Sequence, residues 1–569
     1  MLTLVGLHTR PLTPIDETRY ISVAWEMWLR GEYLLPIKNG LPYSDKPPLL
    51  MWLYQAGWAI FGVNEWWPRL VSPLFSCASL LLTFALGRRL WPQRLGLPGA
   101  ATLILTSCLL WILFSTSAMF DVMLACLALL AIFGIVLAAG GDARRGFMLF
   151  GVALGLGLLA KGPVILLHSI PVALLAPWWR PGLAARRWYA GLAIATLAGV
   201  AIALAWAIAA GLGGGEEYRR DIFWQQTAER MVHSFAHRRP LWWYLPLVPL
   251  VLFPWLFWPA FWRGARGLFR DGPDPASRFC LAWMVPVFIG FSLISGKQVH
   301  YLIPLFPAFA LFAARAIDDR TEGIAWIPLV AIAAGAALVA LGLDWIRLPK
   351  GGLAAPPGLW SAFALILLGP ATWALASRTR ALTALALFGS SLAALLQSSL
   401  SAAIRADYDV TPLATAIHQA QAAGRIVANG AQYHDQFHFA GRLQESLAEI
   451  ESKEGLVAWL RAHPNDSAVI YLKNPSELDG LPTRAVQHYR GSVAALLDAP
   501  TALALLVPEE RQTTAGKTGV AVVQQPSATR NPVSAATEPH TPQSPGTSDN
   551  ATMDHPQDAR SPAPPADAT

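Results

Sequence analysis

The sequence predicts a polytopic α-helical membrane protein with a small C-terminal α/β domain. Of its 569 residues, 54% are hydrophobic and only 14% are charged, whereas a soluble domain carries about 25% charged residues. Runs such as 188–212 are apolar over the roughly 20 residues that a helix needs to cross a bilayer. The period-two alternation typical of membrane β-strands is missing from these runs. Helices therefore account for the membrane part of the chain.

The apolar runs predict about twelve membrane spans. Each run is bounded by loops that carry basic residues, glycine or proline, as expected where a helix leaves the bilayer. The expected spans are 66–88, 97–115, 120–140, 146–162, 163–179, 188–211, 241–262, 279–295, 300–316, 323–343, 359–376 and 381–402.

Lysine and arginine counts in the short loops predict the orientation of these spans. Alternate loops, beginning with 86–96 and 141–146, hold sixteen basic residues, whereas the short loops between them hold four. Because basic loops stay in the cytoplasm, the first set is expected there. The segments 9–65 and 212–240, which contain interfacial helices, then lie on the opposite face. In a bacterial inner membrane that face is periplasmic.

The composition changes at about residue 405, so 1–404 is expected to be the membrane domain. Residues 405–510 alternate helix-like and strand-like segments, which is typical of a small α/β domain. Residues 511–569 are rich in Pro, Ser, Thr and Ala and lack the apolar side chains that would offset the entropy of ordering. We expect a soluble periplasmic domain followed by a disordered tail.

The cysteines and the net charge indicate little about function. All four cysteines fall within apolar runs, where a cysteine usually behaves as a small hydrophobic residue. The net charge of +7 reflects mainly loop arginines, and no feature of the chain supports nucleic-acid binding. No phosphate-binding glycine loop for a nucleotide-sugar is present either.

Two adjacent carboxylates, Asp16 and Glu17, begin the helical pattern of "PIDETRYISVAWEM". One interpretation is that they stabilise the start of a helix through its dipole. Another is that one of them is a catalytic base and the other its structural partner. The two interpretations are compatible.

Further polar residues fall at the ends of apolar runs on the same expected face. Asp45 and Lys46 precede Pro47, and Lys46 could either snorkel to the interface or bind a lipid phosphate. Asp121 and Lys161 stand at the mouths of spans, where ionisable residues are functional candidates. Two basic stretches, 229–246 and 295–307, suit an anion pocket; they contain Arg230, His233, His237, Arg238, Arg239, Lys297, His300 and Tyr301. Together these residues favour a site for an anionic amphiphile.

The order of these motifs resembles that of a known family. A "DE-x-R-Y" loop is followed by "DKPP", an Asp between two early helices, "LAKGP", "H-x-x-P-x-W-x-Y" and "K-x-x-x-Y-L-x-P-x-x-P". This set resembles the polyprenyl-phosphate-sugar-dependent glycosyltransferases of the GT-C superfamily. The resemblance extends over about residues 10–510 and is strongest to the 4-amino-4-deoxy-L-arabinose lipid A transferases and the protein O-mannosyltransferase-like enzymes.

The resemblance implies a function and a role for each matching residue. It implies transfer of a sugar from undecaprenyl phosphate to a periplasmic lipid or glycan acceptor, with inversion at the anomeric carbon, by a monomeric enzyme. It implies a divalent metal ion shared by Asp45 and His237 and no other cofactor. The expected catalytic residues are Asp16, Glu17 and Asp121, the expected phosphate ligands are Lys46, Arg230, Lys297 and Tyr301, and the further site candidates are Arg19 and Lys161.

Two further expectations concern the N-terminus and an alternative function. Family members have a full helix before the first loop, whereas only 1–9 precede Arg10; we therefore expect Met1 to lie inside a thirteenth span. A transporter is the main alternative function. It is disfavoured because transporters place polar residues near the bilayer midplane, often in paired repeats, whereas here they gather at one face.

Overall fold

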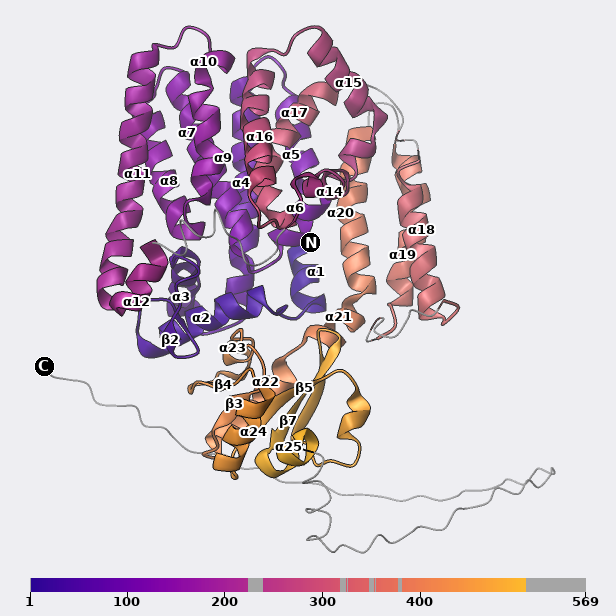
Figure 1. Ribbon diagram of the computed structural model, residues 1–569. Coiled ribbons are helices and arrows are strands. Elements are labelled where there is room, and N and C mark those ends of the chain that lie inside the picture. The colour runs from indigo at the N-terminus through magenta and orange to yellow at the C-terminus, as the bar shows by residue number, and fades with distance from the viewer. Residues whose placement is uncertain are drawn as a thin grey trace, which may run out of the picture. The chain divides into compact units, whose positions relative to one another are not determined.

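The computed structural model describes residues 2–223, 239–317, 324, 326–346, 353, 355–376 and 381–507 (Figure 1). Arg230, His237 and the expected disordered tail 511–569 lie outside these residues. Within them the chain is mostly helical.

The N-terminal segment consists of short helices and a hairpin. It consists of α1 (Leu2–Thr9), α2 (Asp16–Arg30), the two-stranded antiparallel hairpin β1 (Ile37–Lys38) and β2 (Leu41–Pro42), and α3 (Leu49–Phe61). α2 ends at Gly31, which adopts the left-handed conformation with φ of 63°. Glycine reaches that conformation without a steric penalty and is the usual residue after a helix. The turn sends the chain back along α2 into the hairpin.

Seven helical segments in the described residues are long and apolar enough to cross a membrane. An eighth span would be formed by a pair of helices, α5 (Leu97–Ser107) and α6 (Leu109–Ser115), which are bent by 70° at Cys108. The seven are α4 (Trp66–Leu90), α7 (Phe120–Ala139), α8 (Ala143–Lys161), α11 (Ala185–Gly213), α16 (Pro275–Leu293), η4 with α17 (Val299–Leu305 and Phe306–Ile317) and α20 (Ala381–Ser399).

Four of the twelve expected spans are shorter or interrupted in the structure. The expected span 163–179 is divided into α9 (Val164–Leu174) and α10 (Ala176–Trp179), and the spans expected from 323 and 359 are α18 (Leu329–Gly342) and α19 (Leu359–Leu375). The span expected over 241–262 contains four prolines, each of which removes a backbone donor and disfavours a continuous helix. It forms η2 (Leu241–Tyr244), α14 (Leu247–Val251), η3 (Trp255–Phe257) and the start of α15 (Pro259–Arg270). The chain is thus a multi-pass helical membrane protein, and twelve spans stay a prediction.

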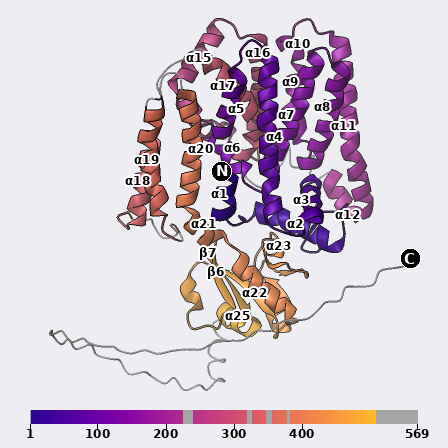
Figure 2. The same cartoon turned by 180° about the vertical axis from the view of Figure 1, so that it is seen from behind.

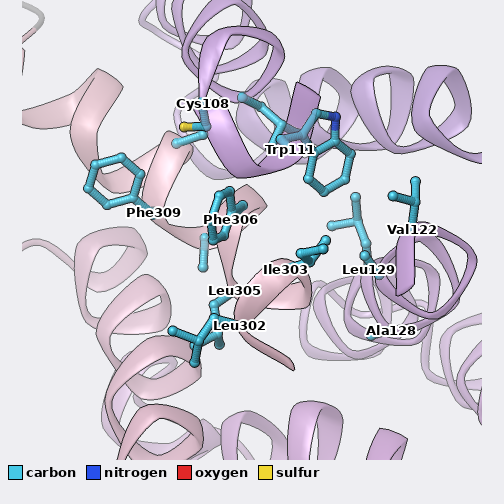
Figure 3. Packing of buried hydrophobic residues seen from close by; sticks show 14 of the residues in the cluster. Cys108, Trp111, Val122, Ala128, Leu129, Leu302, Ile303, Leu305, Phe306 and Phe309 are labelled. Atoms are coloured by element: carbon cyan, nitrogen blue, oxygen red, sulfur yellow. The ribbon is translucent and has the colours of Figure 1, made fainter. Parts of the chain in front are cut away.

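Helix α7 lies inside the bundle, and 83% of its most apolar window is buried by protein. Figure 3 shows side chains of α6, α7, η4 and α17 converging on it, among them Trp111, Leu129 and Ile303. α7 and α8 approach closely through glycines: a Cβ added at Gly134 would lie 2.7 Å from the Gly146 carbonyl oxygen. Small residues let helices in a membrane pack this tightly. The close packing fixes the ends of α7 and α8, where Asp121 and Lys161 lie.

Residues 401–507 form helices around a five-stranded sheet of order β4-β3-β5-β7-β6. β3 pairs in parallel with β4 and β5, and β7 pairs antiparallel with β5 and β6. The strands are β3 (Val427–Asn429), β4 (Ala448–Glu449), β5 (Ser467–Leu472), β6 (Ala485–Tyr489) and β7 (Ser492–Asp498); the helices are α21 (Ser401–Tyr408), α22 (Thr411–Ala422), α23 (His438–Gly441), α24 (Lys453–Ala462), η5 (Pro475–Leu478) and α25 (Ala499–Leu506).

Side chains alternate along β5 and supply two separate cores. Val469 packs in one cluster with α22, whereas Ala468 and Ile470 pack in another with α24 and α25. This is the period of two expected when both faces of a sheet are covered by helices. Figure 2 shows α22 on the face turned away from the viewer of Figure 1.

The loop after β3 and the helix α23 contact α2 and the β1–β2 hairpin. The indole of Trp25 donates to Leu443 O at 3.0 Å, and the backbone N–H of Phe439 donates to Ser22 Oγ at 3.0 Å. The Asn39 side chain donates to Leu447 O and accepts from Leu447 N, at 2.9 and 2.8 Å. These directional contacts hold α2 against the C-terminal region.

Candidate active site

The two carboxylates at the start of α2 have different surroundings. The Asp16 side chain is 41% exposed; it accepts a hydrogen bond from Tyr20 Oη at 3.1 Å and lies 3.6 Å from the Arg19 guanidinium. Glu17 is buried. Its oxygens accept from both terminal nitrogens of Arg10, from the hydroxyl and the N–H of Thr13, and from the N–H of Ala118. Asp16 is therefore accessible, whereas every hydrogen-bonding position of Glu17 is in use.

The contacts of Glu17 indicate a positioning role. Burial alone would raise the pKa of Glu17, but the Arg10 guanidinium and Thr13 outweigh it and hold this pKa below its usual value. Glu17 therefore stays ionised and fixes the segment before α2 to the turn before α7. This division matches the sequence interpretation in which one carboxylate acts and its neighbour supports it. The helix-start interpretation also holds in part, because both carboxylates lie in the first turn of α2.

A second group of polar side chains lies where α7, α8 and η4 meet. Asp121, in the first turn of α7, accepts from Lys161 Nζ at 2.5 Å, and His300 Nε2 lies 3.8 Å from the same carboxylate oxygen. Lys161 Nζ also lies 5.1 Å from the centre of the Tyr301 ring, within the range of a cation–π contact. Asp121 is 2% exposed and Lys161 14%. The buried carboxylate is thus matched by a cation that still reaches solvent.

Tyr20 and His300 connect this group to Asp16. The hydroxyl of Tyr20 binds Asp16, and its ring packs edge-on against Phe120, with ring centres 4.6 Å apart. His300 interacts electrostatically with Asp121, Lys161, Asp16 and Lys46. The structure therefore brings together residues from four separate segments. We call Asp16, Asp121, Lys161 and His300 the Asp16 cluster.

The remaining predicted site residues have varied positions. Lys46 Nζ donates to Asp45 O at 3.1 Å and interacts electrostatically with Asp121. Arg19 lies against both Asp16 and Tyr43. Lys297 is buried and donates to two backbone carbonyls, those of Arg239 (3.1 Å) and Ile294. Its contacts support the backbone around η4, and no contact in the described residues joins it to the Asp16 cluster.

The expected metal ligands can be placed only in part. Asp45 lies next to Lys46 in the turn before α3, whereas His237 falls outside the described residues. Shared metal binding by Asp45 and His237 therefore stays a prediction, and no step of the chemistry below passes through a metal ion.

Sequence reasoning did not assign His300 and Tyr20 to this cluster. It grouped His300 with Lys297 and Tyr301 in a basic stretch, because these residues are neighbours in the chain. The structure instead turns His300 toward Asp121. Tyr20 lies one helical turn after Asp16, and this i,i+4 spacing was the available evidence that the two side chains touch.

Comparisons with known proteins identify similar sequences and structures. A family described as "Dolichyl-phosphate-mannose-protein mannosyltransferase" matches residues 45–206. The undecaprenyl phosphate-alpha-4-amino-4-deoxy-L-arabinose arabinosyl transferase of Aeromonas hydrophila is 32% identical over 56% of this chain and 59% of its own length. The Pseudomonas aeruginosa enzyme of the same name is 33% identical over 56% and 58%. The matches thus span less than two thirds of these curated relatives.

Two solved structures share the fold. The structure of ArnT from Cupriavidus metallidurans in the apo state has a TM-score of 0.69 at 19% identity and covers 89% of this chain and 96% of that one. The same protein bound to undecaprenyl phosphate has a TM-score of 0.70 at 19% identity, covering 87% and 96%.

The chain therefore shares the fold of the ArnT structures. The resemblance expected from the motifs is confirmed: the chain is similar to the GT-C superfamily and, within it, to the ArnT proteins.

Proposed function

We propose that the protein is a glycosyltransferase that moves a sugar from an undecaprenyl-phosphate donor to an acceptor in the membrane, such as lipid A. The observation that carries this proposal is the Asp16 cluster, in which an accessible carboxylate lies beside lysines and a histidine at one end of the bundle. The names of the relatives and the undecaprenyl phosphate bound to the similar ArnT structure support this choice of donor.

Asp16 has the accessibility that a general base needs. Its exposed carboxylate can accept the proton of an acceptor hydroxyl as that oxygen attacks the sugar. Tyr20 and Arg19 both contact the same oxygen of this carboxylate, Oδ1, and so fix its direction. Glu17, buried one residue further on, fixes the start of α2. We assign Asp16 as the base and Glu17 as its positioning residue.

The lysines can stabilise the lipid phosphate that leaves when the bond to the sugar breaks. The bond between the sugar and the phosphate breaks to leave a lipid phosphate, which already carries charge and needs little protonation. Cations held in place before the reaction stabilise such a charge without reorganising. Lys46 and Lys161 supply them here, with Asp121 and Tyr301 fixing Lys161. We keep Arg230 as a further phosphate ligand, and we assign Lys297 to supporting this pocket through the backbone. Direct displacement by the acceptor inverts the anomeric carbon.

The positions of helix ends support a periplasmic site. α7 begins beside Asp121, and α8 ends at Lys161, so both residues lie at the same end of this helix pair. Arg144 and Arg145, in the first turn of α8 next to the loop between the two helices, lie at the other end. Because arginine-rich loops stay in the cytoplasm, the cluster faces the periplasm.

The acceptor is tested by mass spectrometry of lipid A, envelope glycans and membrane proteins from a deletion strain. We expect lipid A to lose one sugar, and plasmid-borne wild-type protein to restore it. Loss of a sugar from a membrane protein would instead favour protein glycosylation, the second candidate, which the match over residues 45–206 supports. Unchanged glycosylation of all three fractions would contradict the proposed function.

A further inference from the structure

A second cluster of ionisable side chains lies toward the other end of α2. Glu26 of α2 meets Asp435 and His438 from the loop after β3 and the start of α23. One ligand atom from each residue lies within 4.8 Å of the others, and all three residues are at most 2% exposed. We call these three residues the Glu26 cluster. None of them takes part in the chemistry proposed above.

The Glu26 carboxylate is held in place by the β1–β2 hairpin. It accepts from the backbone N–H groups of Asn39 at 2.5 Å and Gly40 at 2.8 Å, and it lies 3.3 Å from the Arg30 guanidinium. These contacts fix the position of the Glu26 carboxylate within the cluster.

His438 presents one ring nitrogen to this carboxylate. Its Nδ1 lies 2.7 Å from Tyr433 Oη, and its Nε2 lies 3.9 Å from Glu26 Oε1. In the tautomer whose Nδ1–H donates to Tyr433, Nε2 carries the lone pair on the side of Glu26. Ligand histidines commonly have such a partner on their other nitrogen.

Asp435 is the residue that the protein alone leaves unsatisfied. It is fully buried, and within the described residues neither carboxylate oxygen has a partner in hydrogen-bond geometry, although the Glu26 carboxylate and the Asn39 backbone lie close enough to interact with it. The neighbouring base is His438, whose Nδ1 lies 3.5 Å away. Lys38 is near, but its ammonium donates to Tyr433 O at 3.0 Å. Burial and the Glu26 carboxylate raise the pKa of Asp435 well above its usual value.

The unpaired, buried carboxylate of Asp435 must be balanced by another group. An unpaired polar group away from water costs several kcal/mol, and a charge costs more. A second carboxylate beside it adds repulsion. Either a proton or a cation must therefore enter the cluster. A proton would neutralise one carboxylate, but it would leave unused the Nε2 lone pair that faces the same space.

We propose that Glu26, Asp435 and His438 bind a divalent transition-metal ion of the Zn²⁺ or Mn²⁺ class. Two carboxylates and a neutral imidazole are ligands that both ions accept, whereas Ca²⁺ and Mg²⁺ prefer oxygen ligands alone. Ligands bound about 2.1 Å from a common ion lie roughly 3–4 Å from one another. The 3.9 Å separation between His438 Nε2 and Glu26 Oε1 is in this range, and the 4.8 Å limit for the three ligand atoms requires only a small inward movement.

The ion joins two parts of the chain that are far apart in sequence. One ligand belongs to α2, which also carries Asp16, and two belong to the C-terminal region. Binding to the folded state alone adds stability. The inference does not depend on the proposed glycosyltransferase activity, because neither metal content nor unfolding requires the donor sugar.

The test measures metal content in the full-length protein, purified in detergent, stripped with EDTA, reloaded separately with Zn²⁺ or Mn²⁺ and desalted. All proteins carry Asp45→Asn, which removes the other expected metal ligand. We expect the parent to retain about one equivalent of metal and Asp435→Asn to lose it. Glu445→Gln, which changes an exposed carboxylate in the same region, is the matched control and should retain it.

Thermal unfolding of the same parent protein gives a second measurement. We expect EDTA to lower its melting temperature and added Zn²⁺ or Mn²⁺ to restore it, with no response in Asp435→Asn. If Asp435→Asn does not fold, the parent's metal content and its response to EDTA decide whether the protein binds the metal ion. A parent that retains no metal after reloading, and whose melting temperature is unchanged by EDTA, would overturn the proposal. The same holds if Asp435→Asn retains as much metal as the parent.

Discussion

Helix α2 contributes one carboxylate to each of two polar clusters. The clusters contain similar residues, but in the part of the chain that the structure describes only one of them has a lysine paired with its buried aspartate. Asp16 and Glu26 are ten residues apart on this helix, about 15 Å along its axis. In the Asp16 cluster the buried Asp121 lies 2.5 Å from Lys161. In the Glu26 cluster the buried Asp435 has no lysine or arginine within ion-pair distance among the described residues. The first cluster, with Lys46 beside it, suits an anion, and the second suits a cation.

This difference shows that the residue types alone do not define a site. Both clusters contain two carboxylates and a histidine, so a list of ionisable residues would treat them alike. The position of a single ammonium group decides which ligand charge each one accepts. Three substitutions in or beside the Asp16 cluster test this comparison.

The largest effect is expected for Asp16→Asn. The amide keeps the shape of the side chain but cannot accept the acceptor's proton, so the transfer rate should fall by about 10²–10⁴-fold. Transfer is measured in proteoliposomes with an undecaprenyl-phosphate sugar, and donor binding should change little. Glu445→Gln serves as the control. A rate near that of the wild type would remove Asp16 from the role of base.

A smaller effect, on stability, is expected for Lys161→Met. This change leaves Asp121 buried without its cation, and breaking a buried pair on one side costs about 3–5 kcal/mol in free energy of unfolding. Adding Asp121→Asn should recover most of the loss, because it removes the unpaired charge. Chemical denaturation in detergent measures both variants. If the double variant were no more stable than Lys161→Met, the two groups would not be paired in solution.

The smallest effect is expected for Glu17→Gln, and it should depend on pH. The folded-state pKa of Glu17 lies below its unfolded value because Arg10 and Thr13 outweigh the effect of burial. The ionised carboxylate therefore stabilises the fold above the unfolded pKa, and this contribution disappears as pH falls through the folded pKa. The difference in free energy of unfolding between wild type and variant should be about 2 kcal/mol at pH 7.

Unfolding of both proteins between pH 7 and about pH 3.5 checks the sign of this effect. The difference should shrink as pH falls below the usual range for a glutamic acid. A difference that stayed constant, or that grew toward acid pH, would show that Glu17 gains no stabilisation from Arg10.

The parts of the fold that local patterns control were predictable from the sequence. Unbroken apolar runs located α4, α7, α8, α11, α16 and α20, and the charges at their ends identified Asp121 and Lys161. The segment 241–262 was predicted wrongly as one span, because average hydropathy does not register what its four prolines do to a helix.

The Glu26 cluster could not be predicted from the sequence. Glu26 and Asp435 are over 400 residues apart, and each alone looks like an ordinary polar residue in a polar segment. Their meeting depends on how α2, the hairpin and the loop after β3 pack, which no local pattern encodes. The pairing of Asp121 with Lys161 was easier to anticipate, since adjacent antiparallel helices bring the start of one beside the end of the next.

The bend between α5 and α6 has a consequence for the synthesis of the protein. At this bend the N–H of Leu109 leaves the helical pattern and donates to Phe253 O at 3.2 Å, and Ser107 Oγ accepts from the Trp255 indole at 3.1 Å. A backbone group in the bilayer needs a protein partner or water. At the ribosome, Leu109 gains this partner only after more than 140 further residues have been made. Until then the N–H of Leu109 must bond elsewhere, either to water or within a straighter helix, so the bend is completed only when the second half of the bundle arrives.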